Sequence, residues 1–197
     1  MTKFDRPKDA VQYPVNTLIS GRWSPRSFDD QDIQNSTLMS LFEAVRWAAS
    51  SMNAQPWEFI YAHKGSEAHG KIAQTLMDGN VSWAEEAPVL MIAMIRKYLG
   101  NGKPNGSARH DLGLAMGNLS LQAEELGIGL HQMGGFYPQK ARELFNLPED
   151  VEPVTAVALG YYGDPEQLSE PLKSREIAKR SRKEVTAFAF QDSYQAT

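Results

Sequence analysis

Apolar residues recur at helical spacing over the two most regularly patterned stretches of the chain. The longer stripe runs from Leu112 to Leu126 and stops at Gly127, and glycine commonly follows the last turn of a helix. Few polar residues interrupt this stripe, so we expect a central and largely buried helix. The second stripe runs to Ala49 and starts after Ser36, whose hydroxyl is suited to cap a helix.

Shorter patterned segments complete the chain. Two brief helices are predicted, one over 66–77, ended by Gly79, and one over 138–145. Extended segments are predicted over 57–62, 89–95, 130–138 and 151–163, the last closed by Gly160 and Gly163. Because helices separate the strands and we find no linker or repeat, we expect a single domain over 1–197 with a layered α+β or α/β fold.

Composition and charge limit the possible classes of function. A net charge of −4 at pH 7 is too small for a general nucleic-acid binder. The chain has no cysteine, which excludes disulfides and thiolate chemistry and fits a reducing cytosol. The apolar run at 89–95 is too short to cross a bilayer, and residues 1–15 lack the apolar core of a signal peptide. We therefore expect a cytoplasmic protein with neither membrane nor nucleic acid as partner.

Several common catalytic patterns are missing from the sequence. The stretch GNGKPNG, residues 100–106, lies where a phosphate-binding loop would sit, but Lys103 is followed by Pro104 instead of Ser or Thr, so an exposed loop is favoured. The histidines have no ligand spacing, and no nucleophile elbow occurs. We therefore predict neither a metal site nor a catalytic side chain.

Two basic clusters are candidates for binding an anion. Arg22 and Arg26 flank Ser24 in RWSPR, and Lys173 and Arg175 stand close together in KSR. Each cluster alone is more typical of solvated surface charge. Together they are suited to a phosphate group, because arginine binds phosphate through forked hydrogen bonds.

Two further stretches have an unusual composition. AASSMNAQPWEF, residues 48–59, joins a predicted helix to a predicted strand with hydroxyls, amides and a tryptophan but no glycine. Such a linker is suited to holding a flat, polar ligand. MGGF, residues 133–136, is either a simple turn or a place where the main chain approaches a planar ring closely. The basic stretch 179–183 is expected to be a solvated helix face.

In their order along the chain these motifs resemble the nitroreductase family of FMN-dependent oxidoreductases. The resemblance rests on RWSPRSF, ASSMNAQPWEF, Asn80, the helix HDLGLAMGNLSLQAEELGIG, MGGF and KSR, and covers roughly residues 18–176. It implies a mostly antiparallel central sheet flanked by helices, and an intertwined homodimer with shared active sites. Trp83 departs from the family, since some relatives carry a lysine there.

The resemblance also implies which residues bind FMN. Arg22, Trp23, Ser24 and Arg26 would form the first flavin-binding segment. Arg22 and Ser24 would contact the phosphate and ribityl chain, and Arg26 would lie near the pyrimidine edge. Lys173 and Arg175 would close on the phosphate.

The remaining implied contacts surround the flavin ring. Those from the partner subunit would be Ser50, Ser51, Asn53 and Gln55. Asn80 would hydrogen-bond the ring edge, while Met133, Gly134 and Gly135 would line the far side, with the Gly135 N–H toward N5. The implied reaction takes a hydride from NADH or NADPH to the flavin and then to a nitroaromatic, quinone or similar small acceptor.

Two alternatives stay open. A related flavoenzyme could use the same scaffold for reductive dehalogenation or flavin destruction. A dimeric module that binds flavin or a nucleotide without turnover would share the same phosphate clusters. Activity with NAD(P)H distinguishes the enzymes from the binding module.

Overall fold

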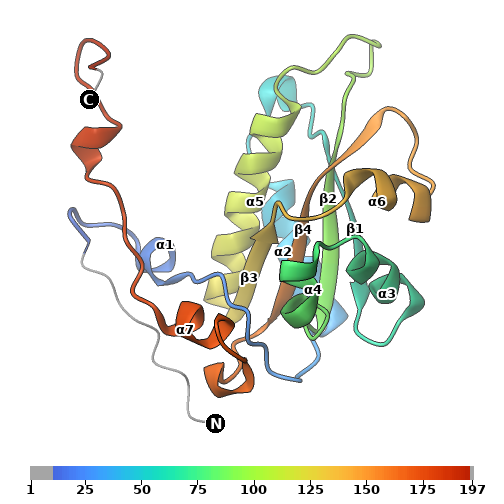
Figure 1. The fold of residues 1–197 in the computed structure, drawn as a ribbon. Helices are drawn as coiled ribbons and strands as arrows, with labels where there is room; N and C mark the ends of the chain where they lie inside the picture. Colours follow the sequence, from blue (N-terminus) through green and yellow to red (C-terminus); the bar gives the residue numbers. More distant parts are fainter. Residues whose placement is uncertain (1–10, 196–197) are drawn as a thin grey trace.

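A computed structural model describes residues 11–195 of the chain. Its sheet has four antiparallel strands in the order β1-β2-β4-β3 (Figure 1). The strands are β1 (Trp57–His63), β2 (Val89–Arg96), β3 (Ile128–Met133) and β4 (Val151–Tyr161). The predicted α+β class with an antiparallel sheet is confirmed. Residues 1–10, on which the expectation of no signal peptide partly rests, lie outside the described residues.

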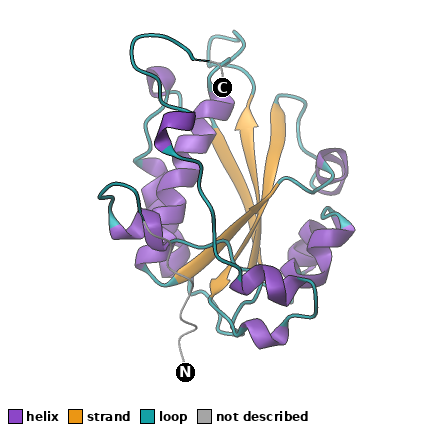
Figure 2. Cartoon of the chain, turned by 60° about the vertical axis from the view of Figure 1, so that its left-hand side comes forward, coloured by secondary structure: helices purple, strands orange, loops and turns teal. Residues whose placement is uncertain are grey.

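Helices cover both faces of the sheet (Figures 1 and 2). One face carries α2 (Asn35–Arg46) and α5 (Ala108–Glu125), and the other carries α3 (Glu67–Gln74), α4 (Asp78–Ala84) and α6 (Pro138–Leu144). Short elements complete the fold: α1 (Thr17–Gly21), α7 (Leu172–Ile177), η1 (Ser51–Asn53), η2 (Pro165–Gln167) and η3 (Val185–Ala187). Helix α1 packs on α5, and α7 packs on η2.

The central strand β2 is buried on both faces, which explains its unbroken apolar sequence. Side chains alternate between the faces of a strand. Those that face α2 and α5 are Val89, Met91, Ala93 and Ile95, and those that face α3, α4 and α6 are Leu90, Ile92 and Met94. Within residues 11–195, no helix has both the length and the apolar character that a membrane crossing needs.

The helix predicted over 66–77 is wrong at its C-terminal end. The chain leaves α3 early because Met77 donates its main-chain N–H to the carbonyl oxygen of Gly135, at 3.0 Å. It then forms a second helix, α4, which the sequence pattern did not predict. Gly79 lies inside α4 and does not terminate a helix. The long helix predicted from Leu112 is confirmed as α5.

The helix predicted to start after Ser36 and to run to Ala49 has other boundaries in the structure. Helix α2 starts at Asn35 after an extended Gln34, and its first turn has no side-chain cap, so the capping role predicted for Ser36 is wrong. The helix ends at Arg46 instead of continuing to Ala49.

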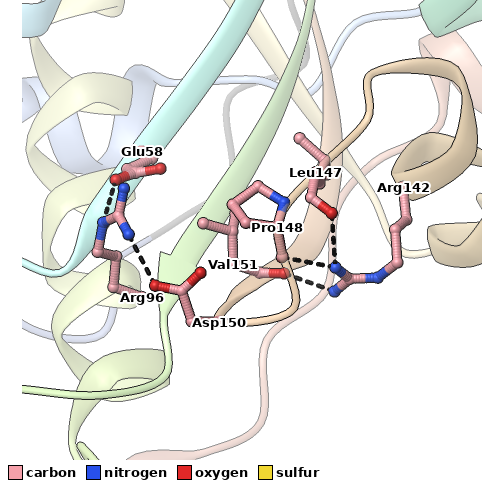
Figure 3. Close-up of polar contacts among 7 residues, drawn as sticks. All are labelled: Glu58, Arg96, Arg142, Leu147, Pro148, Asp150 and Val151. Carbon is pink, nitrogen blue, oxygen red and sulfur yellow. Dashed lines mark hydrogen bonds and ion pairs between the residues drawn. The ribbon is translucent and has the colours of Figure 1, made fainter. Parts of the chain in front are cut away.

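Two arginines fix the connection between α6 and β4 (Figure 3). Arg96, at the end of β2, bonds Glu58 on β1 at 2.6 Å and Asp150 ahead of β4 at 2.8 Å. The Arg142 guanidinium of α6 donates to three main-chain carbonyl oxygens, those of Leu147, Pro148 and Val151. Five N–H groups in a rigid fork allow one arginine to satisfy several acceptors. These contacts fix one end of the sheet, where β1 and β4 begin and β2 ends, and their residues do not line the pocket described below.

Candidate functional site

The stretch that follows α1 alternates between buried and half-buried residues. Trp23 and Pro25 are buried, whereas Arg22, Ser24 and Arg26 are half-buried. This alternation places the two arginines and the serine on a different side of the chain from the buried residues. The resemblance places Trp23 among the flavin-binding residues, but its side chain is buried and packs in the interior.

Two glycines on neighbouring strands make room for this stretch. Gly129 of β3 pairs with Gly160 of β4. A Cβ atom on Gly129 would lie 2.4 Å from Pro25 Cγ, and one on Gly160 would lie 2.7 Å from Phe28 Cδ1. Only glycine permits such close packing. The prediction that Gly160 ends the strand is wrong, because Gly160 lies inside β4.

His131 fastens the same stretch to β3. Its Nδ1 lies 2.9 Å from the carbonyl oxygen of Pro25, which can only accept, so Nδ1 carries the proton. The ring packs on Trp83, with the ring centroids 4.5 Å apart. Burial lowers the pKa of His131 to about 4, so the imidazole is neutral at pH 7. Trp83 is 1% exposed and acts as a core residue.

A pocket of about 420 Å³ opens between this stretch, α5 and β3. Its walls include Arg22, Ser24, Gly113, Gly117, Leu130 and Gln132. An added Cβ on Gly113 or Gly117 would meet nothing within 4 Å, so these glycines widen the pocket. The volume lies in the range of about 300–1,000 Å³ typical of small-molecule sites.

The guanidinium of Arg22 lines this pocket, and the charges of two further arginines act on it. Arg22 donates to the Ser24 hydroxyl at 3.3 Å. Burial lowers the pKa of Arg22 from its ordinary value, and the positive charges of Arg180 and Arg182 lower it further. The prediction of a solvated helix face at 179–183 is wrong, because the chain is not helical there and Arg180 is half-buried. The basic character of that stretch is the one signal in the sequence that could have indicated a place near an anion site.

Arg26 has an acidic partner that the sequence did not reveal. Its guanidinium lies 3.8 Å from the Glu176 carboxylate and 5.9 Å from the centroid of the Trp83 ring. The positive charge predicted to lie near the flavin is therefore partly compensated within the protein.

The MGGF turn is tied to Asn80 by a contact that the sequence did not predict. The Asn80 side-chain amide donates to the carbonyl oxygen of Gly135 at 2.9 Å. A Cβ atom on Gly135 would lie 2.7 Å from that amide nitrogen, so glycine is needed for the contact. Gly134 is exposed. Met133 is 3% exposed, and its side chain packs in the core beneath the turn, on the side of the sheet that carries α3, α4 and α6.

The linker at 50–55 forms an exposed and strained turn. Met52, Asn53 and Gln55 have positive φ angles of 53°, 55° and 46°, a region that non-glycine residues adopt at a cost. The turn is held by Ser50 Oγ, which accepts from the Gln55 N–H at 3.1 Å. As far as residues 11–195 show, Ser50, Ser51, Asn53 and Gln55 do not line the pocket of their own chain.

A buried carboxylate on α5 supports this turn from inside. Asp111 is 1% exposed, and its Oδ2 accepts the Ser51 N–H at 3.2 Å. Nothing in the sequence marks this carboxylate as buried, because Asp111 lies in the first turn of a helix, where acidic residues are common.

The second basic cluster is only partly brought to the site. Helix α7 lies beside the stretch after α1 (Figure 1), but the Lys173 ammonium pairs with Glu166 at 2.7 Å. Arg175 is exposed. The structure thus places Arg180, rather than Lys173, against the backbone of Arg22. No cluster of three or more potential metal ligands occurs among the described residues.

A sequence model of the nitroreductase family matches residues 19–80 and 66–161. The chain therefore belongs to the nitroreductase family, and the resemblance seen in the sequence is confirmed. A solved structure titled as an oxidoreductase containing FMN has a TM-score of 0.91 and 33% identity, with 100% of both chains covered.

Curated relatives carry related names. A putative NADH dehydrogenase/NAD(P)H nitroreductase of Stenotrophomonas maltophilia is 29% identical over 175 residues, which covers 78% of this chain and 87% of that protein. The FMN reductase [NAD(P)H] of Bacillus subtilis is 29% identical over 170 residues, which covers 76% of this chain and 66% of that protein.

Proposed function

We propose that this protein takes a hydride from NADH or NADPH and passes it, through bound FMN, to a small acceptor such as a nitroaromatic or a quinone. Its class, an NAD(P)H-dependent flavin oxidoreductase, agrees with the names of the curated relatives. The observation that carries the proposal is the pocket beside α5, where Arg22 and Ser24 offer phosphate donors beside an open glycine wall. Reductant and acceptor would use the site in turn.

The residues present fit FMN. Arg22 and Ser24 would hold the phosphate and ribityl chain, while Asn80 and Gly135 would meet the ring edge. Bound FMN supplies the hydride chemistry itself. The chain's part is to fix the phosphate, to orient the ring and to place the Arg26 charge near its pyrimidine edge. We expect no side chain to act as an essential acid.

The colour of the purified protein tests this proposal. We expect yellow protein whose flavin absorbance bleaches when NADH or NADPH is added and returns with a quinone or nitroaromatic. Bleaching with turnover of halogenated phenols alone would favour dehalogenation. Yellow protein that no nicotinamide reduces would favour the binding module, and colourless protein that ignores added FMN would contradict the proposal.

We also propose a homodimer of single-domain chains, in which the turn at 50–55 meets the partner's pocket. This turn is strained, and Met52 is 78% exposed. The C-terminal segment leaves the body of the molecule (Figure 1) and exposes Phe188 and Tyr194. If these side chains packed against a second copy of the chain, their apolar surface would be removed from water.

Light scattering tests the dimer directly. We expect a mass of twice the 22.0 kDa chain, whereas a monomer that still binds FMN tightly would contradict the shared site. A cytoplasmic location likewise stays a prediction.

A further inference from the structure

Helix α7 carries a buried carboxylate that faces the stretch after α1. Glu176 is 3% exposed, although its helix is short and lies at the surface. One carboxylate oxygen accepts the main-chain N–H of Arg26 at 3.0 Å. The main-chain N–H of Ser27 and the indole N–H of Trp23 also lie toward this carboxylate and lower its pKa. Burial raises the pKa of Glu176, and these donors oppose the rise.

Arg180 grips the same stretch from a second direction. Its guanidinium donates to the carbonyl oxygens of Ser20, at 2.7 Å, and of Arg22, at 2.5 Å. The Arg180 Cζ atom also lies 4.9 Å from the centroid of the Trp23 ring, within the range of a cation–π contact. Arg180 therefore holds the Trp23 ring at its face, while Glu176 holds the main chain three residues further on, at Arg26.

The clamped tryptophan lies between two residues that line the pocket. Arg22 and Ser24 stand on either side of Trp23 in the chain and both reach the pocket wall. Trp23 is 6% exposed. Fixing its indole ring thus fixes the direction in which its two neighbours project.

We propose that Glu176 and Arg180 are positioning residues, which clamp the stretch around Trp23 from both sides so that Arg22 and Ser24 point at the ligand's phosphate. This inference rests on the proposed binding of FMN. The clamp serves the phosphate end of the site, so its loss weakens binding of FMN more than binding of riboflavin, which has the same ring and no phosphate. A residue that only stabilised the fold would affect both flavins alike.

The variant Glu176→Gln tests the clamp. One carboxylate oxygen accepts the Arg26 N–H and also faces the Arg26 guanidinium, whereas the amide of glutamine has no charge and only one accepting oxygen. The dissociation constants of FMN and riboflavin are measured by fluorescence quenching on the full chain after removal of bound flavin. We expect the FMN constant to rise about tenfold, and the riboflavin constant to change by less than about threefold.

Two further variants make the result decisive. Arg180→Lys keeps the charge but loses the fork that spans two carbonyl groups, so it should shift the same ratio even if Glu176→Gln fails to fold. Glu67→Gln, which removes an exposed carboxylate paired with Lys71 on α3, should leave both constants unchanged. Equal weakening of both flavins in the clamp variants, or no change in either, would overturn the inference.

The wild-type protein separates this inference from the proposed function. If the wild type binds neither flavin, the proposed function fails. If the wild type prefers FMN to riboflavin and the clamp variants keep that preference, only the clamp is wrong.

Discussion

Replacing Arg22 by alanine is expected to weaken FMN binding about a hundredfold while leaving riboflavin binding nearly unchanged. Loss of a forked, charge-assisted contact to a phosphate removes about 3 kcal/mol. Arg22 is suited to this role because it lines the pocket and already bonds Ser24. The nearby charges of Arg180 and Arg182 repel it in the ligand-free protein, and a bound phosphate dianion would relieve that repulsion.

Calorimetry or fluorescence quenching with both flavins measures the effect. The Arg22→Ala protein should unfold at the same temperature as the wild type or higher, because the variant removes a repulsive charge without emptying the core. Lys71→Ala, which removes an exposed cation of α3, is the matched control and should bind FMN normally. An unchanged FMN constant in Arg22→Ala would show that the phosphate lies elsewhere.

Acid should unfold this protein partly through His131. Its pKa is lowered from an ordinary 6.5 to about 4 in the folded chain, chiefly by burial, with the charges of Arg26 and Arg22 adding to the effect. The folded protein therefore favours the neutral ring. The stabilisation is fully present above about pH 6.5 and is lost as the pH falls through 6.5 toward 4, by about 3 kcal/mol in total.

Urea unfolding of the wild type and His131→Gln at a series of pH values isolates this contribution. At pH 7 the wild type should be more stable, since the variant disturbs the contact with Pro25. The difference in free energy of unfolding between the wild type and His131→Gln should fall by about 3 kcal/mol between pH 7 and pH 4. His69 is also buried with a lowered pKa, but it is common to both proteins and cancels in the difference. A difference that stays constant with pH would contradict the assignment to His131.

Local patterns predicted those elements that carry a continuous apolar stripe or are apolar over their whole length. The stripe from Leu112 became α5, and the apolar run at 89–95 became the central strand. Patterns failed where a distant contact decided the end of an element. Helix α3 stops early because the chain turns to meet Gly135. No periodicity in the sequence records a hydrogen bond to a residue so far along the chain.

For the candidate site, the sequence indicated which residue types would meet but not how they are held. RWSPR, Asn80 and MGGF were found from their order along the chain, and the structure joins Asn80 to Gly135. The roles of Glu176 and Asp111 were missed. An acidic residue in a short helix or a first helical turn is usually solvated, and only its surroundings reveal that it is buried.

The sequence by itself therefore determined the layered arrangement of helices and strands and the cationic and glycine-rich motifs, because these depend on residue type and spacing. The order of the motifs also indicated the family, and the resemblance to that family implied the antiparallel sheet. Only the tertiary structure decided that Gly129 and Gly160 lie side by side beneath Pro25 and Phe28. It also decided that Arg180 supports Arg22. Such contacts depend on strand register and on the path of loops between distant segments, and a linear pattern does not encode either of them.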